Sequence, residues 1–157
     1  MPKHPGYPFE AKSTAHVREG DFWGIPLRRG GWYACGRVLR VWDSRVNLTV
    51  GLLDWCEPVL PSADNIAGAH VLDYSMVHIK SIRLTGGAIL GHRPLQDDGG
   101  WEGLVGEPDR GPGVHEGSWG YLHIEDLAHE HFGRHFPEHP TPAVERPTPL
   151  QSDSRDS

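Results

Sequence analysis

Hydrophobic and polar residues alternate in short runs along the first half of the chain, a pattern typical of β-strands. In the stretch 19–38, two apolar runs flank a basic, glycine-rich connection, Arg28-Arg29-Gly30-Gly31. A short glycine-containing connection between two such runs predicts a β-hairpin. Because Pro26 has no backbone N–H, we expect the first strand to lie at a sheet edge or its pairing to be interrupted there.

The second strand of this hairpin continues towards Trp42, and Gly36 breaks its alternation, which predicts a β-bulge. After a turn at residues 43–45, every second residue is apolar, which predicts a third strand with one face in the core; these residues are Val46, Leu48, Val50 and Leu52. Three consecutive antiparallel strands are typical of a small barrel or a highly curved sheet.

The middle of the chain is less regular. Residues 57–68 indicate a loop, and residues 70–84 fit two patterns: their second half alternates as a strand does, which we favour, whereas Leu72, Met76, Ile79 and Arg83 have helical spacing. Ala88-Ile89-Leu90-Gly91 predicts a further buried strand. Residues 94–120 combine eight glycines with acids and prolines, which predicts a long surface loop that a few apolar contacts hold in place.

The two ends look less foldable than the middle. Residues 1–17 predict a flexible arm whose first anchor is Val17, and residues 137–157 predict a disordered tail rich in Pro, Ser, Thr and charge. Helical spacing of apolar residues from Ile124 predicts a short C-terminal helix that ends at Gly133. We therefore expect a single domain over residues 18–136, mainly β and at most α+β: a small, strongly curved antiparallel sheet or partly open barrel with one short C-terminal helix.

Composition narrows the class of protein. The chain has 157 residues, with 20 glycines, 14 prolines and two cysteines, too few cysteines for a disulfide scaffold. No apolar run approaches the roughly 20 residues of a membrane span, and the first residues lack the apolar region of a signal peptide. We expect a cytoplasmic protein with no membrane partner and with Cys35 and Cys56 reduced.

Charge is distributed unevenly along the chain. The formal net charge is −6, and residues 94–130 hold nine acids but only one base, Arg110. Such a segment repels nucleic acid and favours encounter with a cationic partner. A solvated acidic loop without a partner is the alternative interpretation.

A histidine-rich segment raises the possibility of a metal site. His129, His131 and His135 lie in AHEHFGRH, where imidazoles two and four residues apart could converge on one ion. The zinc-protease motif requires a second histidine four residues after the first, but position 133 is Gly. We favour solvent-exposed histidines and keep a metal-dependent enzyme as an alternative.

Other catalytic signatures are missing from the sequence. Cys35 lies in the interior of a predicted strand, where a thiol is normally packed and protonated. No serine has a nucleophile-elbow context, and Gly86-Gly87 lacks the Lys-Ser/Thr of a phosphate loop. We therefore expect no catalysis and no cofactor.

Aromatic and basic residues leave a second alternative open. The six tryptophans first serve as core bulk, although one or two exposed ones would be enough to anchor a partner. A small barrel that binds single-stranded nucleic acid would combine such aromatics with a basic groove, and several arginines are close in sequence: Arg28, Arg29, Arg37, Arg40 and Arg45. The acidic segment argues against this alternative.

The segment REGDFWGIPLRRGGWYACGRVLRVW, followed by VNLTVGLLDW and GGAILGHRPL, resembles the immunity protein 26 family of bacterial polymorphic toxin systems. The resemblance spans residues 18–95. Its most specific parts are Gly20-Asp21 before Ile25-Pro26-Leu27, Gly36-Arg37-Val38, and Ile89-Leu90-Gly91-His92.

The resemblance implies a small, mainly β immunity protein that binds and neutralises a co-encoded toxin without catalysis. A cationic toxin such as a nuclease would suit the acidic segment. The hypothesis is that acids and tryptophans after residue 95 occlude the toxin, with the candidate partner-binding residues Asp97, Asp98, Trp101, Glu102, Trp119, Glu125 and Asp126.

Overall fold

The hairpin at the start of the domain forms as predicted. The computed structural model describes residues 3–28, 30–111 and 117–133. Within them, β1 (Asp21–Pro26) pairs antiparallel with β2 (Tyr33–Val41), and the N–H of Leu27 donates to the carbonyl of Trp32 at 2.9 Å. Gly30 and Gly31 have φ of +73° and +78°, a conformation that glycine adopts without strain.

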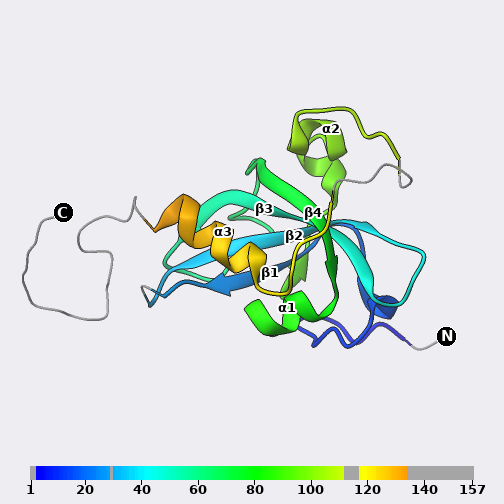
Figure 1. Ribbon diagram of the computed structural model, residues 1–157, viewed down its shortest axis with the longest axis horizontal. Coiled ribbons are helices and arrows are strands. Elements are labelled where there is room, and N and C mark those ends of the chain that lie inside the picture. Colours follow the sequence, from blue (N-terminus) through cyan, green and yellow to red (C-terminus); the bar gives the residue numbers. More distant parts are fainter. Residues whose placement is uncertain (1–2, 29, 112–116, 134–157) are drawn as a thin grey trace, which may run out of the picture.

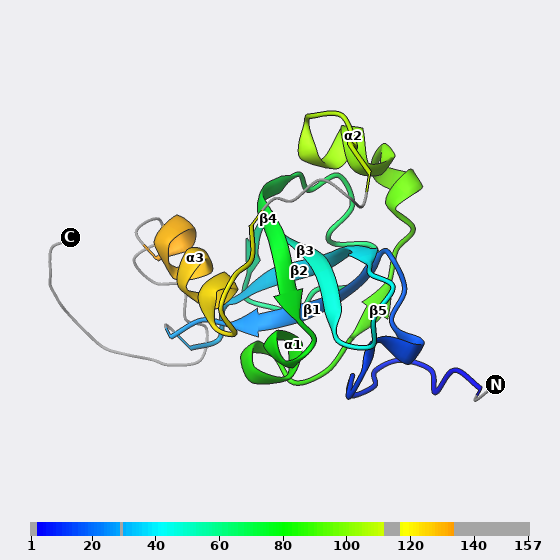
Figure 2. The same ribbon diagram turned by 45° about the vertical axis from the view of Figure 1, so that its right-hand side comes forward.

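Five antiparallel strands form one open sheet in the order β4-β3-β2-β1-β5, where β3 is Asn47–Glu57, β4 is Val71–His78 and β5 is Gly91–His92. Figure 1 shows the twisted sheet with short helices around it, and Figure 2 brings β5 forward beside β1. The predicted fold class, mainly β with a C-terminal helix, is confirmed. β1 lies inside the sheet, but its pairing with β5 stops at Phe22, and Pro26 is its last residue.

The pairing of β2 with β3 is irregular beside the predicted bulge, and Gly36 itself leaves room for a buried tryptophan. The register shifts between Ala34 and Gly36, where the extra residues lie on β3 between Leu52 and Cys56, and Gly36 lies opposite Trp23 on β1. A Cβ atom at Gly36 would lie 2.5 Å from the ring of Trp23. The buried indole also donates Nε1–H to Oγ1 of Thr85 at 3.0 Å. The absence of a side chain at position 36 therefore lets the indole pack directly on the neighbouring strand.

The sheet is buried on both faces, because its strands contribute alternate residues to two cores. Leu48, Val50 and Leu52 of β3 belong to the larger core, as their period of two predicted, whereas Leu53 and Trp55 belong to the second. Val46, the first residue of the predicted set, precedes β3 and is exposed, so its placement in the core is wrong. Helix α3 (His123–Phe132) covers part of the larger core with Ile124 and Ala128. The C-terminal helix is thus confirmed, with Gly133 as its C-cap.

The strand favoured for the second half of residues 70–84 is wrong. β4 occupies the first half, and α1 (Lys80–Thr85) follows it. Ile79, Ile82 and Thr85 are all buried, and their spacing of three places them on one helical face. Burial against the core therefore selects the helical pattern after His78, where β4 ends.

The flexible arm predicted for residues 1–17 is also wrong within the described residues 3–17. Phe9 is buried and exchanges two backbone hydrogen bonds with Ile89, at 2.9 and 3.0 Å. A short 3-10 helix, η1 (Thr14–His16), follows, and Thr14 is bound to the 44–45 turn. Ile89 therefore pairs with the arm, and the strand expected at residues 88–91 is instead β5 at Gly91–His92.

Residues 94–120 are more ordered than the predicted loop. They contain η2 (Leu95–Asp98) and α2 (Gly100–Val105). Gly99 and Gly106 have φ of +92° and +85° and flank α2, so these glycines act as helix boundaries, while Leu104 is buried. Residues 112–116, His135 and the predicted 137–157 tail lie outside the described residues. In the described part of the chain, no helix has both the length and the apolar character needed to cross a membrane.

The contact between Gly36 and Trp23 predicts a steric effect on stability. Gly36→Ala should lower the free energy of unfolding by about 1–3 kcal/mol, the usual cost of overpacking a core. Urea denaturation followed by tryptophan fluorescence measures the loss. Gly120→Ala is the control, because a Cβ there meets no atom within 4 Å. Equal stability of the two variants would contradict the tight packing of Trp23.

Candidate functional site

A buried arginine on β2 connects the sheet to the acidic segment. The side chain of Arg37 is fully buried, and a buried charge requires a counter-charge and hydrogen-bond partners. Nη1 donates to Oδ2 of Asp98 at 2.8 Å. Nη2 donates to the carbonyls of Arg93 and Pro94, at 2.6 and 3.2 Å. The chain that enters η2 is therefore held against β2.

Asp98 is the shared acceptor of this anchor. Its side chain is 3% exposed and also accepts from Arg93, at 2.8 and 3.1 Å, and from the N–H of Gly68 at 2.9 Å. Burial by itself would raise the pKa of Asp98, but hydrogen bonds from Arg93, Gly68 and Arg37 outweigh burial and hold that pKa well below its ordinary value. Asp98 is one of the predicted partner-binding residues, yet its carboxylate is hydrogen-bonded within the protein.

A second buried carboxylate orients a histidine. Asp21, at the start of β1, is fully buried, and its Oδ1 contacts Nδ1 of His92 on β5 at 2.8 Å. The same oxygen accepts from the hydroxyl of Tyr7 at 2.7 Å, and Oδ2 accepts from the N–H of Arg18 at 2.9 Å. Because an ionised carboxylate only accepts hydrogen bonds, Nδ1 of His92 carries the hydrogen.

Tyr7 completes this second network from the N-terminal segment. Burial raises the pKa of its hydroxyl, and the hydrogen bond to Asp21 raises it further against the opposing effect of Arg18. The hydroxyl therefore stays protonated and donates to Asp21, while it accepts from Nη2 of Arg18 at 2.8 Å. Asp21 thus binds three different parts of the chain at one point.

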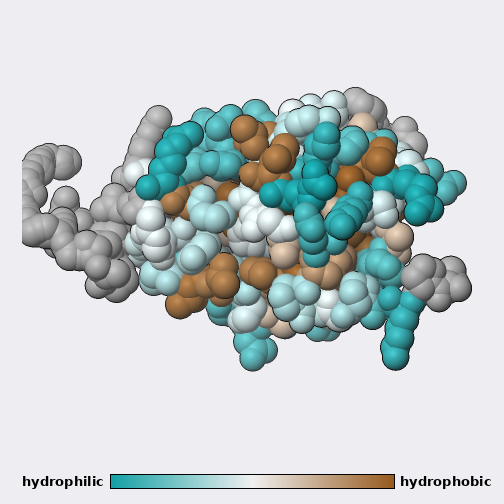
Figure 3. Space-filling model, turned by 90° about the horizontal axis from the view of Figure 1, so that it is seen from below, coloured by the Kyte–Doolittle hydropathy of each residue, from teal (hydrophilic) through white to brown (hydrophobic). Residues whose placement is uncertain are grey.

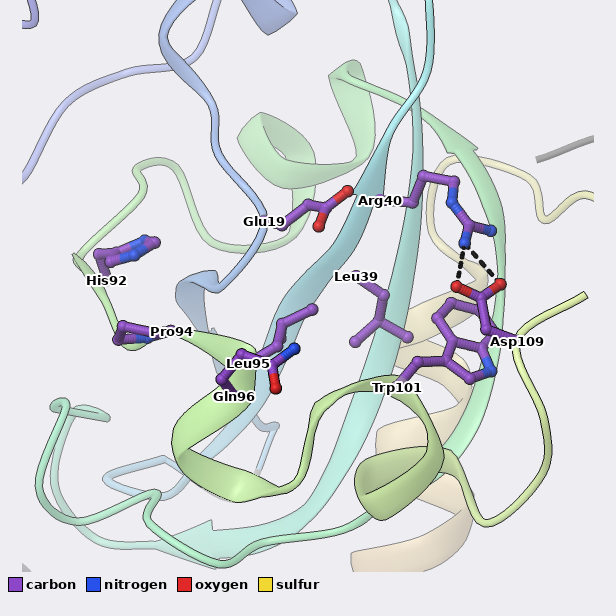
Figure 4. A pocket seen from close by; sticks show the side chains of 9 residues that line it. All are labelled: Glu19, Leu39, Arg40, His92, Pro94, Leu95, Gln96, Trp101 and Asp109. Carbon is purple, nitrogen blue, oxygen red and sulfur yellow. Dashed lines mark hydrogen bonds and ion pairs between the residues drawn. The ribbon is translucent and has the colours of Figure 1, made fainter. Parts of the chain in front are cut away.

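A pocket lies between these two networks. Its volume is about 300 Å³, and it is lined by Glu19, Leu39, Arg40, His92, Pro94, Leu95, Gln96, Trp101 and Asp109. Figure 4 shows the side chains from β2, from the β5–η2 segment and from α2 around the opening. The sequence pattern did not indicate Glu19 or Gln96, and it indicated Arg40 only as part of a basic groove. The available signal was the placement of Gly20-Asp21 and Gly91-His92 within the resemblance, since these two motifs meet in β1–β5 pairing.

Arg40 and Trp101 form one wall of the pocket. Arg40 makes two hydrogen bonds to the carboxylate of Asp109, at 2.6 and 2.7 Å, and these lower the pKa of Asp109. The guanidinium carbon of Arg40 lies 4.9 Å from the ring centroid of Trp101, within the range of cation–π attraction. The indole also makes an edge contact with Tyr74, at 5.2 Å between centroids. Trp101, a predicted anchor, is therefore held in place on both sides.

The predicted partner-binding residues separate into two surfaces. Asp97 and Glu102 are exposed on η2 and α2, and with Trp101 and the exposed Glu107 they form a surface that we call the acidic lobe. Glu125 and Asp126 lie on α3. Figures 1 and 2 both place α2 and α3 at different ends of the sheet. The acidic segment is therefore not one continuous surface.

Trp119 belongs with α3. Its indole packs against the larger core, and its backbone N–H donates to the carbonyl of Met76 on β4 at 2.9 Å. Its ring also lies 5.3 Å from that of His123. Its main role in the described part of the molecule is to hold the segment before α3 against the sheet.

The predicted metal candidates have other contacts. His129 uses both ring nitrogens: Nδ1 contacts the carbonyl of Glu125 at 2.9 Å, and Nε2 accepts from the N–H of Arg28 at 2.9 Å. This histidine therefore connects α3 to the β1–β2 turn. His131 is exposed. No group of three potential metal ligands occurs among residues 3–28, 30–111 and 117–133.

The two thiols are suited to packing. Cys35 is fully buried, and burial raises its pKa far above the ordinary range despite the opposing charge of Arg37. Burial, followed by the charge of Glu57, raises the pKa of Cys56 to about 11. Both sulfurs are protonated near neutral pH, whereas nucleophilic attack requires the thiolate.

Two arginines of the predicted basic groove are already bound to other groups of the protein. Arg37 is enclosed by Asp98 and backbone carbonyls, and Arg40 is paired with Asp109. Arg28 and Arg45 are exposed, and Arg29 lies outside the described residues. Since phosphate binding requires accessible cations, the pairing of Arg37 and Arg40 weakens the nucleic-acid alternative.

The Asp98 anchor predicts an acid-sensitive contribution to stability. Asp98→Asn should lower the free energy of unfolding by about 3 kcal/mol at pH 7, because it leaves buried Arg37 without a counter-charge. The pKa of Asp98 is lower in the folded protein than its ordinary 3.8, so the unfolded chain takes up the proton first as pH falls. The deficit of the variant should therefore be full above about pH 5 and shrink progressively below that pH.

Urea denaturation from pH 7 to pH 3 measures this deficit. Asp97→Asn is the matched control, since its neighbouring carboxylate is exposed and its loss should change stability by less than about 0.5 kcal/mol. A deficit for Asp98→Asn that stayed constant down to pH 3 would show that its charge is not what stabilises the fold.

The chain was compared with protein families, curated proteins and solved structures. No protein-family model, no curated protein and no solved structure matches this chain.

Proposed function

We propose that this chain is an immunity protein that binds a cationic toxin in the cytoplasm of the producing cell and neutralises it by occlusion. The resemblance of residues 18–95 to the immunity protein 26 family supports this role. Its quoted motifs also contact one another: Asp21 binds His92, and Arg37 binds the segment that follows His92. The motifs thus form the structural base of the pocket and the acidic lobe.

The acidic lobe is the observation that carries the proposal. Asp97, Glu102 and Glu107 are exposed in the segment that carries Trp101, while Asp98 of the same segment is held by two arginines. The contacts of Asp98, and the hydroxyl of Tyr74 that donates to Glu107 at 2.9 Å, hold the backbone that carries these charges, so less ordering entropy is lost when a partner binds. Complementary charge speeds encounter and selects the partner's orientation.

Occlusion requires no chemical step by this chain. A basic groove that binds nucleic acid or another anionic substrate would be covered by the acidic lobe, with Trp101 as a candidate aromatic anchor. Figure 3 shows the face on the α1 side, where hydrophobic side chains lie among hydrophilic ones. The charged lobe is therefore a better candidate than this face for recognising a cationic partner.

Charge reversal tests the position of the interface. Asp97→Lys with Glu102→Lys should weaken binding to the toxin encoded beside this chain's gene by at least about tenfold, or about 1.4 kcal/mol. The salt dependence of the remaining affinity should also fall, because two attractive charges become repulsive. Titration calorimetry at two ionic strengths measures both effects, and survival of cells that express the toxin reports protection.

The matched control is Asp126→Lys with Glu130→Lys, which makes the same charge change at exposed positions of α3. Binding by this variant should stay within about twofold of the parent. If the α3 pair instead reduced binding and the lobe pair did not, the proposed interface would be wrong. If the parent neither bound the toxin nor protected the cell, the proposed function itself would fail.

A further inference from the structure

His92 lines the pocket with an unused ring nitrogen. Its Nδ1 is bound to buried Asp21 at 2.8 Å, which fixes the ring and leaves Nε2 as the lone-pair nitrogen of the neutral imidazole. Within the described residues, Nε2 has no hydrogen-bond partner and is not among the buried polar atoms. The pocket therefore offers an oriented acceptor that reaches solvent.

Glu19 supplies a second acceptor at the same pocket. It is exposed, lines the cavity and has no ion-pair partner among the described residues. Arg40 is the cation of the lining, but its charge is balanced by two hydrogen bonds to Asp109. Glu19 and Nε2 of His92 thus offer a negative charge and a lone pair, which attract a donor with positive charge. The exposed amide of Gln96 at the same pocket is neutral.

The remaining lining suits the aliphatic part of a long side chain. Leu39 and Leu95 lie on the wall between the Glu19 region and Trp101. The volume of about 300 Å³ is at the small end of ligand sites. Lysine and arginine combine an apolar stem with a charged end. The two leucines suit the stem, and the Glu19 carboxylate and Nε2 of His92 suit the charged end.

We infer that this pocket takes a lysine or arginine side chain of the toxin, with its charged end between the Glu19 carboxylate and Nε2 of His92. This inference rests on the proposed function and makes it more specific, because it places a site for one cationic side chain beside the acidic lobe. We call this site the socket. An anionic group would face Glu19 and a lone-pair nitrogen without an available counter-charge, since Arg40 is already paired.

Two substitutions remove the acceptors with little change of shape. Glu19→Gln removes the charge. His92→Asn keeps a donor near the position of Nδ1 for Asp21 and removes Nε2. Each should weaken binding of the toxin at least about tenfold, or about 1.4 kcal/mol, because it removes a hydrogen bond to a charged group. Glu10→Gln, which lines a different cavity, is the control and should leave the affinity unchanged.

A small probe tests the pocket without the toxin. N-acetyl-arginine methylamide and N-acetyl-lysine methylamide should shift the NMR signals of Trp101 and His92, and the neutral N-acetyl-citrulline methylamide should not. Glu19→Gln and His92→Asn should each abolish the shifts, with thermal unfolding showing that the variants remain folded.

The outcomes separate this inference from the proposed function. If the toxin binds but the cationic probes do not, or if citrulline binds equally well, the socket is wrong and the immunity role stands. If the cationic probes bind but the toxin does not, the socket stands as a site for cationic side chains and the immunity role fails. Unchanged toxin affinity in both acceptor variants would also overturn the socket.

Discussion

The burial of one positive charge on β2 determines much of the architecture around the proposed site. Arg37 lies in the interior, where an unpaired guanidinium would be strongly destabilising. It is compensated by Asp98 and by the carbonyls of Arg93 and Pro94. Because these partners all come from the segment between β5 and α2, that segment must lie against the sheet, and the short helices after it are positioned accordingly.

Asp21 makes the corresponding connection at the other side of the pocket. It joins the N-terminal segment through Tyr7, the residues just before β1 through the N–H of Arg18, and β5 through His92. The two buried carboxylates thus hold residues distant in sequence on opposite sides of one cavity. Pocket walls that hydrogen bonds already hold in place need less ordering when a partner binds, which lowers the entropy lost on binding.

The position of each carboxylate separates structural from recognition roles. Asp97 and Asp98 are adjacent in sequence, yet one is exposed and the other is enclosed by two arginines. The enclosed one fixes the backbone, and the exposed one contributes to the field that a partner meets. A strongly acidic segment can therefore be well ordered when part of its charge is used internally. The proposed immunity role depends on the exposed part alone.

The local sequence pattern was sufficient to predict the elements in which apolar residues recur at a constant spacing. The β1–β2 hairpin, the alternation of β3, the irregular pairing beside Gly36 and helix α3 follow from spacing and glycine chemistry, because a face buried along one element repeats in sequence. The strand-to-helix change at His78, the packing of Phe9 and the order of α2 depended on contacts with distant segments. The pocket was beyond sequence reasoning for the same reason: Glu19, Arg40, His92 and Gln96 have no common period. The pairing of β1 with β2 and β5, together with the hydrogen bonds of Arg37 and Asp21, brings them to one place.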